Sequence, residues 1–110
     1  MKRARSYSGV TKEALEVLGK LVRARRLERA MTAEELSERV GITRKTLRNI
    51  ENGEAGTEIG TVFEVAALVG VRLFGMDDRE LSMHKARLDE KLALLPKMVR
   101  PSHQDVKDDF

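Results

Sequence analysis

The sequence has no cysteine and no tryptophan, only two prolines, and aromatic residues at 4% of its 110 positions. The lack of cysteine excludes a disulfide framework and a thiolate metal site. No apolar run is long enough to span a membrane, and the basic segment 1–5 is not followed by the apolar stretch of a secretory signal. We therefore expect a cytoplasmic protein with no membrane partner.

What the sequence does have is an abundance of helix-forming residues. Charged residues make up 35% of the chain and apolar residues 41%, with Ala, Leu, Glu, Lys and Arg dominating. The length suffices for one compact domain with tails. This composition predicts an all-α fold.

Positive charge is concentrated near the beginning of the chain. Residues 1–30 contain nine Lys or Arg against three Glu, whereas residues 31–76 contain five against seven and residues 77–110 contain seven against eight. A local basic surface attracts polyanions, of which nucleic acid is the usual one, although a basic segment is also often merely solvated. Charge alone leaves these two interpretations open.

The first helix is predicted to follow a flexible basic arm at 1–10. Thr11 is a plausible N-cap, and apolar residues at helical spacing predict a helix that ends near Arg29. The apolar stripe of this helix, which we expect in the core, comprises Leu15, Leu18, Leu21 and Val22.

Two short helices are predicted within residues 32–52. Thr32 and Glu35 form a capping-box pattern, and Gly41 supplies the left-handed conformation that ends a helix at little cost. Thr43 can cap a second short helix, which ends at Asn52-Gly53. Such a pair, joined by a glycine-containing turn, is the helix-turn-helix arrangement. The inward positions that the arrangement needs are occupied by Leu36, Ser37, Val40, Leu47 and Ile50.

A fourth and a fifth helix are predicted beyond this pair. Thr57 can cap the fourth, which ends at Gly70, and Asp77 with Glu80 opens the fifth, which ends near Pro96. The leucine stripe of the fifth helix indicates either core or a dimer seam. Residues 96–110 are expected to be a disordered tail. Core positions are expected at Ile59, Val62, Phe63, Ala66, Val69, Val71, Leu73 and Phe74, and the leucine stripe comprises Leu81, Leu88, Leu92 and Leu95.

The outward face of the third helix carries Arg44, Lys45, Arg48 and Asn49. Cations in the first turn oppose the helix dipole, so a purely structural helix would favour acids there. Arg and Lys suit the O6 and N7 atoms of guanine, and Asn can pair with adenine. We therefore predict that this face reads base edges in the DNA major groove.

Catalytic and metal sites are not expected. His84 and His103 have no acidic cluster at ligand spacing, and the acids from Asp77 to Glu80 are better explained as helix caps. No nucleophile constellation or phosphate-binding glycine loop is present. We predict a protein without enzymatic activity or cofactor.

The helix-turn-helix region and its surroundings resemble the phage-repressor (Xre, Cro/CI-like) family. The resemblance implies a five-helix, lambda-repressor-like domain that binds a pseudo-palindromic operator as a homodimer. It places Arg44, Lys45 and Asn49 at base-contacting positions, with Arg48 beside them. The segments that carry it are Leu18–Arg23, Met31–Ser37, Val40–Thr43, Leu47–Gly53 and Val65–Val71.

The same resemblance implies further roles. Helix N-termini grip phosphates in the family, which assigns Thr32 and Thr43 to the DNA interface. Arg26 and Glu51 match a structural salt bridge found in many members. This chain departs from the family at Ala33, where many members carry a Gln that contacts a phosphate.

The flanking segments are the long first helix, Gly60–Val71, Leu94–Arg100 and Asp108–Phe110. They resemble HipB-type antitoxins, which are encoded with HipA-type kinase toxins. The resemblance implies autorepression of an operon and restraint of a kinase partner. An apolar ring beside two carboxylates also suits a linear peptide for a pocket with a basic rim, which assigns Asp108, Asp109 and Phe110 to partner binding.

The sequence thus predicts a transcriptional repressor associated with the nucleoid, with residues 11–95 as its DNA-binding domain. Two alternatives remain. The chain could be a stand-alone Xre-family regulator whose last segment serves dimerisation, or a protein-interaction adaptor that uses the fold without reading bases.

Overall fold

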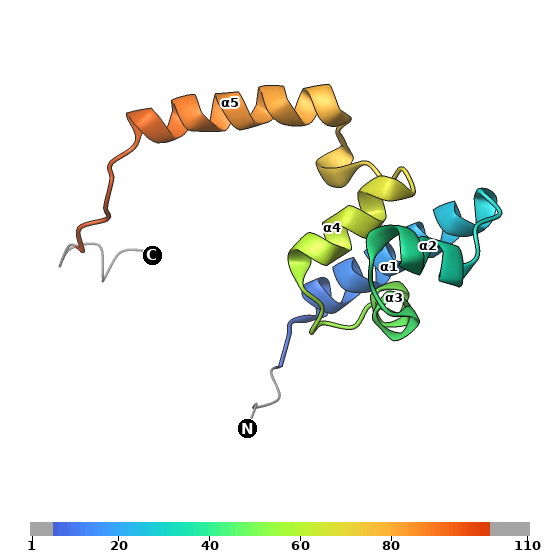
Figure 1. The fold of residues 1–110 in the computed structure, drawn as a ribbon. Helices are drawn as coiled ribbons and strands as arrows, with labels where there is room; N and C mark the ends of the chain where they lie inside the picture. The colour runs from blue at the N-terminus through green and yellow to red at the C-terminus, as the bar shows by residue number, and fades with distance from the viewer. Residues whose placement is uncertain (1–5, 102–110) are drawn as a thin grey trace. The chain divides into compact units, whose positions relative to one another are not determined.

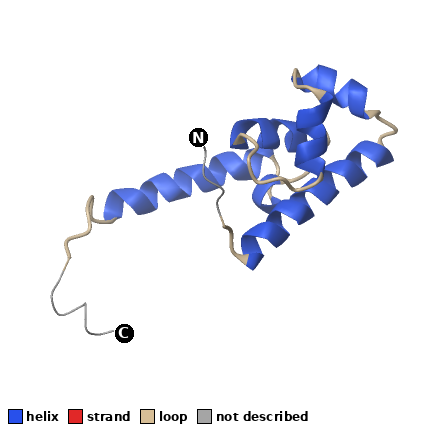
Figure 2. Cartoon of the chain, turned by 90° about the horizontal axis from the view of Figure 1, so that it is seen from below, coloured by secondary structure: helices blue, strands red, loops and turns tan. Residues whose placement is uncertain are grey.

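The computed structural model describes residues 6–101, and the chain divides into two compact units after Gly75. In this part of the chain all regular structure is helical (Figure 2), which confirms the all-α fold class. The expected 11–95 domain extends over both units. The helices are α1 (Gly9–Glu28), α2 (Ala33–Val40), α3 (Arg44–Glu51), α4 (Ile59–Leu68), the 3-10 turn η1 (Leu73–Gly75) and α5 (Asp78–Leu94).

Helix α1 begins earlier than the sequence analysis predicted. Ser8, not Thr11, is the N-cap, and its hydroxyl oxygen accepts a hydrogen bond from the backbone N–H of Thr11 at 3.3 Å. A Ser side chain satisfies the same orphan N–H groups as a Thr, so the helix extends back to the first suitable cap. Gly9 and Val10, which were expected in the arm, are therefore helical.

The first unit packs α1 to α4 around one core (Figure 1). Helix α1 approaches α3 so closely that a Cβ on Gly19 would lie 2.5 Å from the carbonyl oxygen of Ile50. Any side chain at position 19 would force the two helices apart. The buried apolar residues are Val22, Leu36, Leu47, Ile50, Val65, Ala66 and Val69.

Three residues that were expected in the core are exposed. Leu21 is 44% exposed, Ile59 68% and Phe74 75%. Leu21 lies on the side of α1 that faces away from the core, and Ile59 opens the first turn of α4. Phe74 has a φ of 57° within η1 and contacts Phe63 edge to face, with ring centroids 6.1 Å apart. Its ring therefore lies against a neighbouring ring at the surface.

The start of α4 also differs from the prediction. The N-cap is Glu58, not Thr57, and no side chain of the described residues caps the first backbone N–H groups. The Glu58 carboxylate instead accepts a hydrogen bond from the Thr61 hydroxyl at 2.7 Å. The predicted end is confirmed, since Gly70 follows the helix with a φ of 88°.

The second unit consists of α5 and the segment that follows it. Its predicted capping box is present: Glu80 N–H donates to Asp77 at 2.8 Å, and Asp77 N–H donates to Glu80 at 2.9 Å. The helix ends just before Pro96, as predicted, and Leu88, Leu92 and Leu95 are exposed. Within residues 6–101, no helix is both long and apolar enough to cross a membrane.

Candidate nucleic-acid interface

Helices α2 and α3 begin and end where the sequence predicted. The Thr32 hydroxyl oxygen accepts from Glu35 N–H at 3.0 Å, and Thr32 N–H donates to the Glu35 carboxylate at 2.8 Å. Gly41 ends α2 with a φ of 83°, and its N–H and that of Ile42 both donate to the carbonyl oxygen of Ser37. The turn between the helices is thus fixed by backbone hydrogen bonds.

The contact between α2 and α3 is tight because small and apolar side chains lie there. Leu36 and Leu47 are almost fully buried, and Ser37 is 3% exposed. The Ser37 hydroxyl donates to the carbonyl oxygen of Ala33 at 2.7 Å, so its burial leaves no unpaired donor. This packing holds α3 in one orientation relative to α2.

An ion pair between Arg26 and Glu51 links α1 to the end of α3. Nε of Arg26 donates to one carboxylate oxygen at 2.8 Å and Nη2 donates to the other at 3.1 Å, while Nη1 donates to the carbonyl oxygen of Met31 at 3.0 Å. The two side chains are 10% and 8% exposed. The hydrogen bond to Glu51 raises the pKa of the Arg26 guanidinium. The structure therefore contains the pair that the family resemblance implied, and it joins α1, α3 and the segment before α2.

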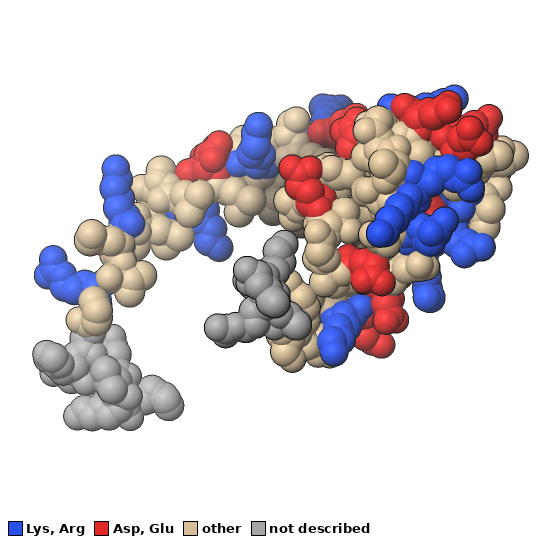
Figure 3. Space-filling model, turned by 60° about the horizontal axis from the view of Figure 1, so that its bottom comes forward, with Lys and Arg blue, Asp and Glu red and all other residues tan. Residues whose placement is uncertain are grey.

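The face of α3 that points away from the buried Leu47 and Ile50 carries the predicted reading residues. Arg44, Lys45 and Arg48 are exposed and Asn49 is half-buried. The first turn contains no acidic residue, so two cations lie where the partial charge of the helix is also positive. An anion placed against this turn would be attracted both by the two cations and by the positive end of the helix dipole. Figure 3 shows Lys and Arg side chains gathered on one face of the molecule, with acidic side chains around them.

A basic hollow lies between α1, α2 and α3. It is lined by the exposed residues Arg23, Arg44 and Arg48, together with Ala33 and Asn52. Among residues 6–101, the only carboxylate that lines it belongs to Glu51, which is already paired with Arg26. Guanidinium groups bind phosphate through paired hydrogen bonds, so the hollow has the chemistry of a phosphate site.

Arg23 is the residue of this hollow that the sequence analysis missed. It precedes Arg26 by one helical turn and therefore lies on nearly the same side of α1. Once Arg26 is paired with Glu51 of α3, that spacing directs Arg23 toward α3 as well. Ala33, at the position where the family resemblance implies a phosphate-contacting Gln, also lines the hollow.

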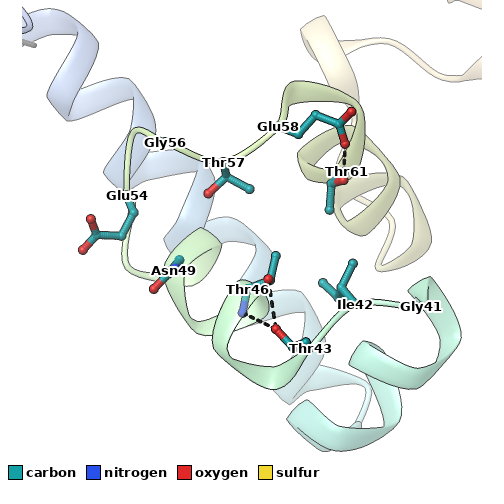
Figure 4. Close-up of a pocket in the computed structure, with 10 residues that line it drawn as sticks. All are labelled: Gly41, Ile42, Thr43, Thr46, Asn49, Glu54, Gly56, Thr57, Glu58 and Thr61. Atoms are coloured by element: carbon teal, nitrogen blue, oxygen red, sulfur yellow. Dashed lines mark hydrogen bonds between the residues drawn. The ribbon is translucent and has the colours of Figure 1, made fainter. Parts of the chain in front are cut away.

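A second groove runs between the turn, α3 and the start of α4 (Figure 4). The Thr43 hydroxyl accepts from Thr46 N–H at 3.1 Å and donates to the Thr46 hydroxyl at 3.0 Å. Asn49 lines this groove together with Glu54 and Glu58. The two carboxylates disfavour phosphate, so this groove suits neutral hydrogen-bonding groups, such as base edges, better than the basic hollow does.

The comparison with protein families identifies this region. The family model described as Helix-turn-helix matches residues 22–75. Residues 22–75 are a helix-turn-helix domain. The match confirms the helix-turn-helix predicted at residues 32–52, and it supports the phage-repressor family and a DNA-binding regulator of transcription. Neither the curated proteins nor the solved structures gave a match to the chain.

Two groups of predicted site residues remain predictions. The DNA-contacting roles concern Thr32 and Thr43 at the two helix starts and the outward residues of α3. The proposed partner-binding residues Asp108, Asp109 and Phe110 lie outside the described residues 6–101.

Proposed function

We propose that the chain is a sequence-specific transcriptional repressor that binds a pseudo-palindromic operator as a homodimer. The observation that supports it best is the outward face of α3, where Arg44, Lys45 and Arg48 are exposed on a helix whose opposite face is fixed in the core. A rigid helix with donors on its free side is what major-groove reading requires.

The two concave surfaces beside α3 suit different parts of DNA, one the backbone phosphates and the other the base edges. We propose that Arg23 and Arg48 of the basic hollow hold a backbone phosphate, with Arg23 making a contact that Ala33 cannot make. Phosphate contacts fix the register of a protein on DNA, and base contacts supply the specificity. Arg44, Lys45 and Asn49 are then assigned to base edges.

The experiment that tests this proposal begins with selection of a preferred duplex from a random pool by the full chain. Gel-shift titration at fixed salt then compares the chain with its Arg44→Ala and Lys45→Ala variants. We expect each lost base contact to weaken operator binding by about 1–3 kcal/mol. Arg72→Ala, which removes an exposed cation outside the interface, is the control for charge alone.

Two results would contradict the proposal. The first is unchanged operator affinity in both α3 variants. The second is equal, salt-dependent affinity of the chain for all duplexes, which would favour the adaptor alternative.

We also propose that the chain is the antitoxin of a HipA-type kinase and represses its own operon. This proposal rests on the resemblance of the flanking segments, and it assigns toxin contact to residues 97–110, with Asp108, Asp109 and Phe110 as anchors. A kinase-like reading frame beside the gene is expected. Such an arrangement would place the protein in the cytoplasm, at the nucleoid.

A pull-down with the neighbouring kinase tests the antitoxin role. A chain trimmed before Lys97 should lose the kinase while keeping operator affinity, which serves as the folding control. Phe110→Ala should weaken capture more than Ser102→Ala. Kinase capture that survives the trim would contradict the tail assignment, and a gene with no adjacent kinase would contradict the antitoxin pairing.

A further inference from the structure

Helix α1 carries a second apolar stripe on the side opposite its core face. Val10, Val17 and Leu21 are 76%, 56% and 44% exposed, and Ala14 and Ala24 are exposed as well. At 3.6 residues per turn these five residues align along one side, which is about half a turn from Gly19 and about a third of a turn from Val22 in the core. A helix that is apolar on two sides is normally covered on both.

The spacing of this stripe is that of a helix-helix seam. Its members follow one another at alternating intervals of four and three residues, which is the pattern of the a and d positions in paired helices. We propose that the occupant is the same stripe of a second copy of this chain, packed antiparallel about Val17. This inference rests on the homodimer of the proposed function and names its surface.

The stripe is complementary to itself only in the antiparallel direction. With Val17 facing its counterpart, Val10 lies against Ala24 of the second copy and Ala14 lies against Leu21. Val10 and Leu21 then each meet an alanine and Val17 meets Val17, so no level of the seam holds two alanines. A parallel arrangement would place Ala14 against Ala14 and leave a gap.

The flanking charges agree with the antiparallel direction. Glu13 and Lys20 lie on the same flank of the stripe, one on each side of Val17. A twofold axis at Val17 brings Glu13 of one copy to within about one residue of the level of Lys20 of the other, and the pair occurs twice in an isologous contact. Within residues 6–101, neither side chain forms an ion pair.

The length of the seam sets its strength. A single pair of helices of this length buries less surface than a standard stable interface, so the association should be reversible and dependent on concentration. Val17→Glu should weaken the dimer at least about tenfold, because each dimer would bury two carboxylates. Glu13→Lys should weaken it about two- to tenfold, and the added Lys20→Glu change should restore it.

Disulfide trapping tests the geometry directly, because the chain contains no native cysteine. Under mild oxidation Val17→Cys should give a linked dimer, whereas Lys12→Cys, an exposed position away from the stripe, should not. A mixture of Val10→Cys and Ala24→Cys chains should form mixed dimers, whereas Val10→Cys alone should stay unlinked. Circular dichroism verifies that each variant keeps its helices.

The outcomes separate the seam from the dimer itself. Sedimentation that shows only monomers at every concentration would overturn both proposals. A dimer in which Val17→Cys links no better than Lys12→Cys, or links preferentially to Leu88→Cys of α5, would overturn the seam and leave the dimer standing. Linking of Val10→Cys to itself would overturn the antiparallel direction.

Discussion

Helices α2 and α3 begin with nearly identical geometry and opposite charge. Each has eight residues, and their Thr caps share almost the same backbone conformation, with φ and ψ of −77° and 159° at Thr32 and −78° and 159° at Thr43. The first turn of α2 contains Glu34 and Glu35, whereas that of α3 contains no acid. One backbone motif is thus used twice with different side chains.

The difference shows which helix is optimised for stability. Acids in the first turn of α2 interact favourably with the helix dipole, and Glu35 also completes a capping box. Arg44 and Lys45 oppose the dipole in α3 and fill no structural need within residues 6–101. Their placement fits a helix whose first turn faces an anionic ligand. Three changes test this comparison, from the largest expected effect to the smallest.

The largest effect is expected from the scaffold that both helices share. Arg26→Ala leaves the Glu51 carboxylate buried without its partner, so the free energy of unfolding should fall by about 3 kcal/mol. Denaturant titration measures this loss. In the double variant with Arg26→Met and Glu51→Leu, the free energy of unfolding should fall much less than in Arg26→Ala, because no unpaired charge remains. Equal losses in both variants would mean that packing, not the ion pair, links α1 to α3.

An intermediate effect is expected at the two caps. Thr32→Ala and Thr43→Ala should each lower the free energy of unfolding by about 1 kcal/mol, because each leaves a helix N–H without its acceptor. Thr32→Ala should lower the free energy of unfolding slightly more than Thr43→Ala does, since it also breaks up the capping box. Thermal or denaturant unfolding gives both values. A negligible loss at Thr43 alone would show that the two starts differ in more than charge.

The smallest effect concerns the sign of the first-turn charges. Arg44→Glu should raise the free energy of unfolding by about 0.3–1 kcal/mol at low salt, whereas Glu34→Lys should lower it by a similar amount. Both differences in the free energy of unfolding should become smaller as salt is added, because exposed charges are screened. A lower free energy of unfolding in Arg44→Glu would contradict the idea that cations in the first turn of α3 destabilise the protein when it is not bound to DNA.

Local sequence patterns predicted the helix starts and stops well where one residue had a unique role. Thr32 with Glu35, Gly41, Thr43, and Asp77 with Glu80 all lie as predicted. The misses occurred where neighbouring residues compete for the same role. Ser8 and Thr11 are both good caps, and the start of α4 uses Glu58 although Thr57 precedes it.

Periodicity identified the apolar stripes but not the side of α1 that faces the core. Leu21 and the residues of the second stripe have the same helical spacing as the buried ones, so the sequence could not assign them. The exposure of Phe74 depends on its positive φ in η1, which no local pattern indicates. The basic hollow was missed for a related reason, because Arg23 becomes relevant only when α1 is placed against α3.

The central claim is that the outward face of α3 reads bases and does not merely attract phosphate. The most direct measurement is the ratio of affinities for the selected operator and a scrambled duplex, at one salt concentration, in the chain and in its double variant Arg44→Ala with Lys45→Ala. The account predicts that this ratio collapses toward one in the double variant while the free energy of unfolding does not fall. A ratio that is unchanged in the folded double variant would contradict it.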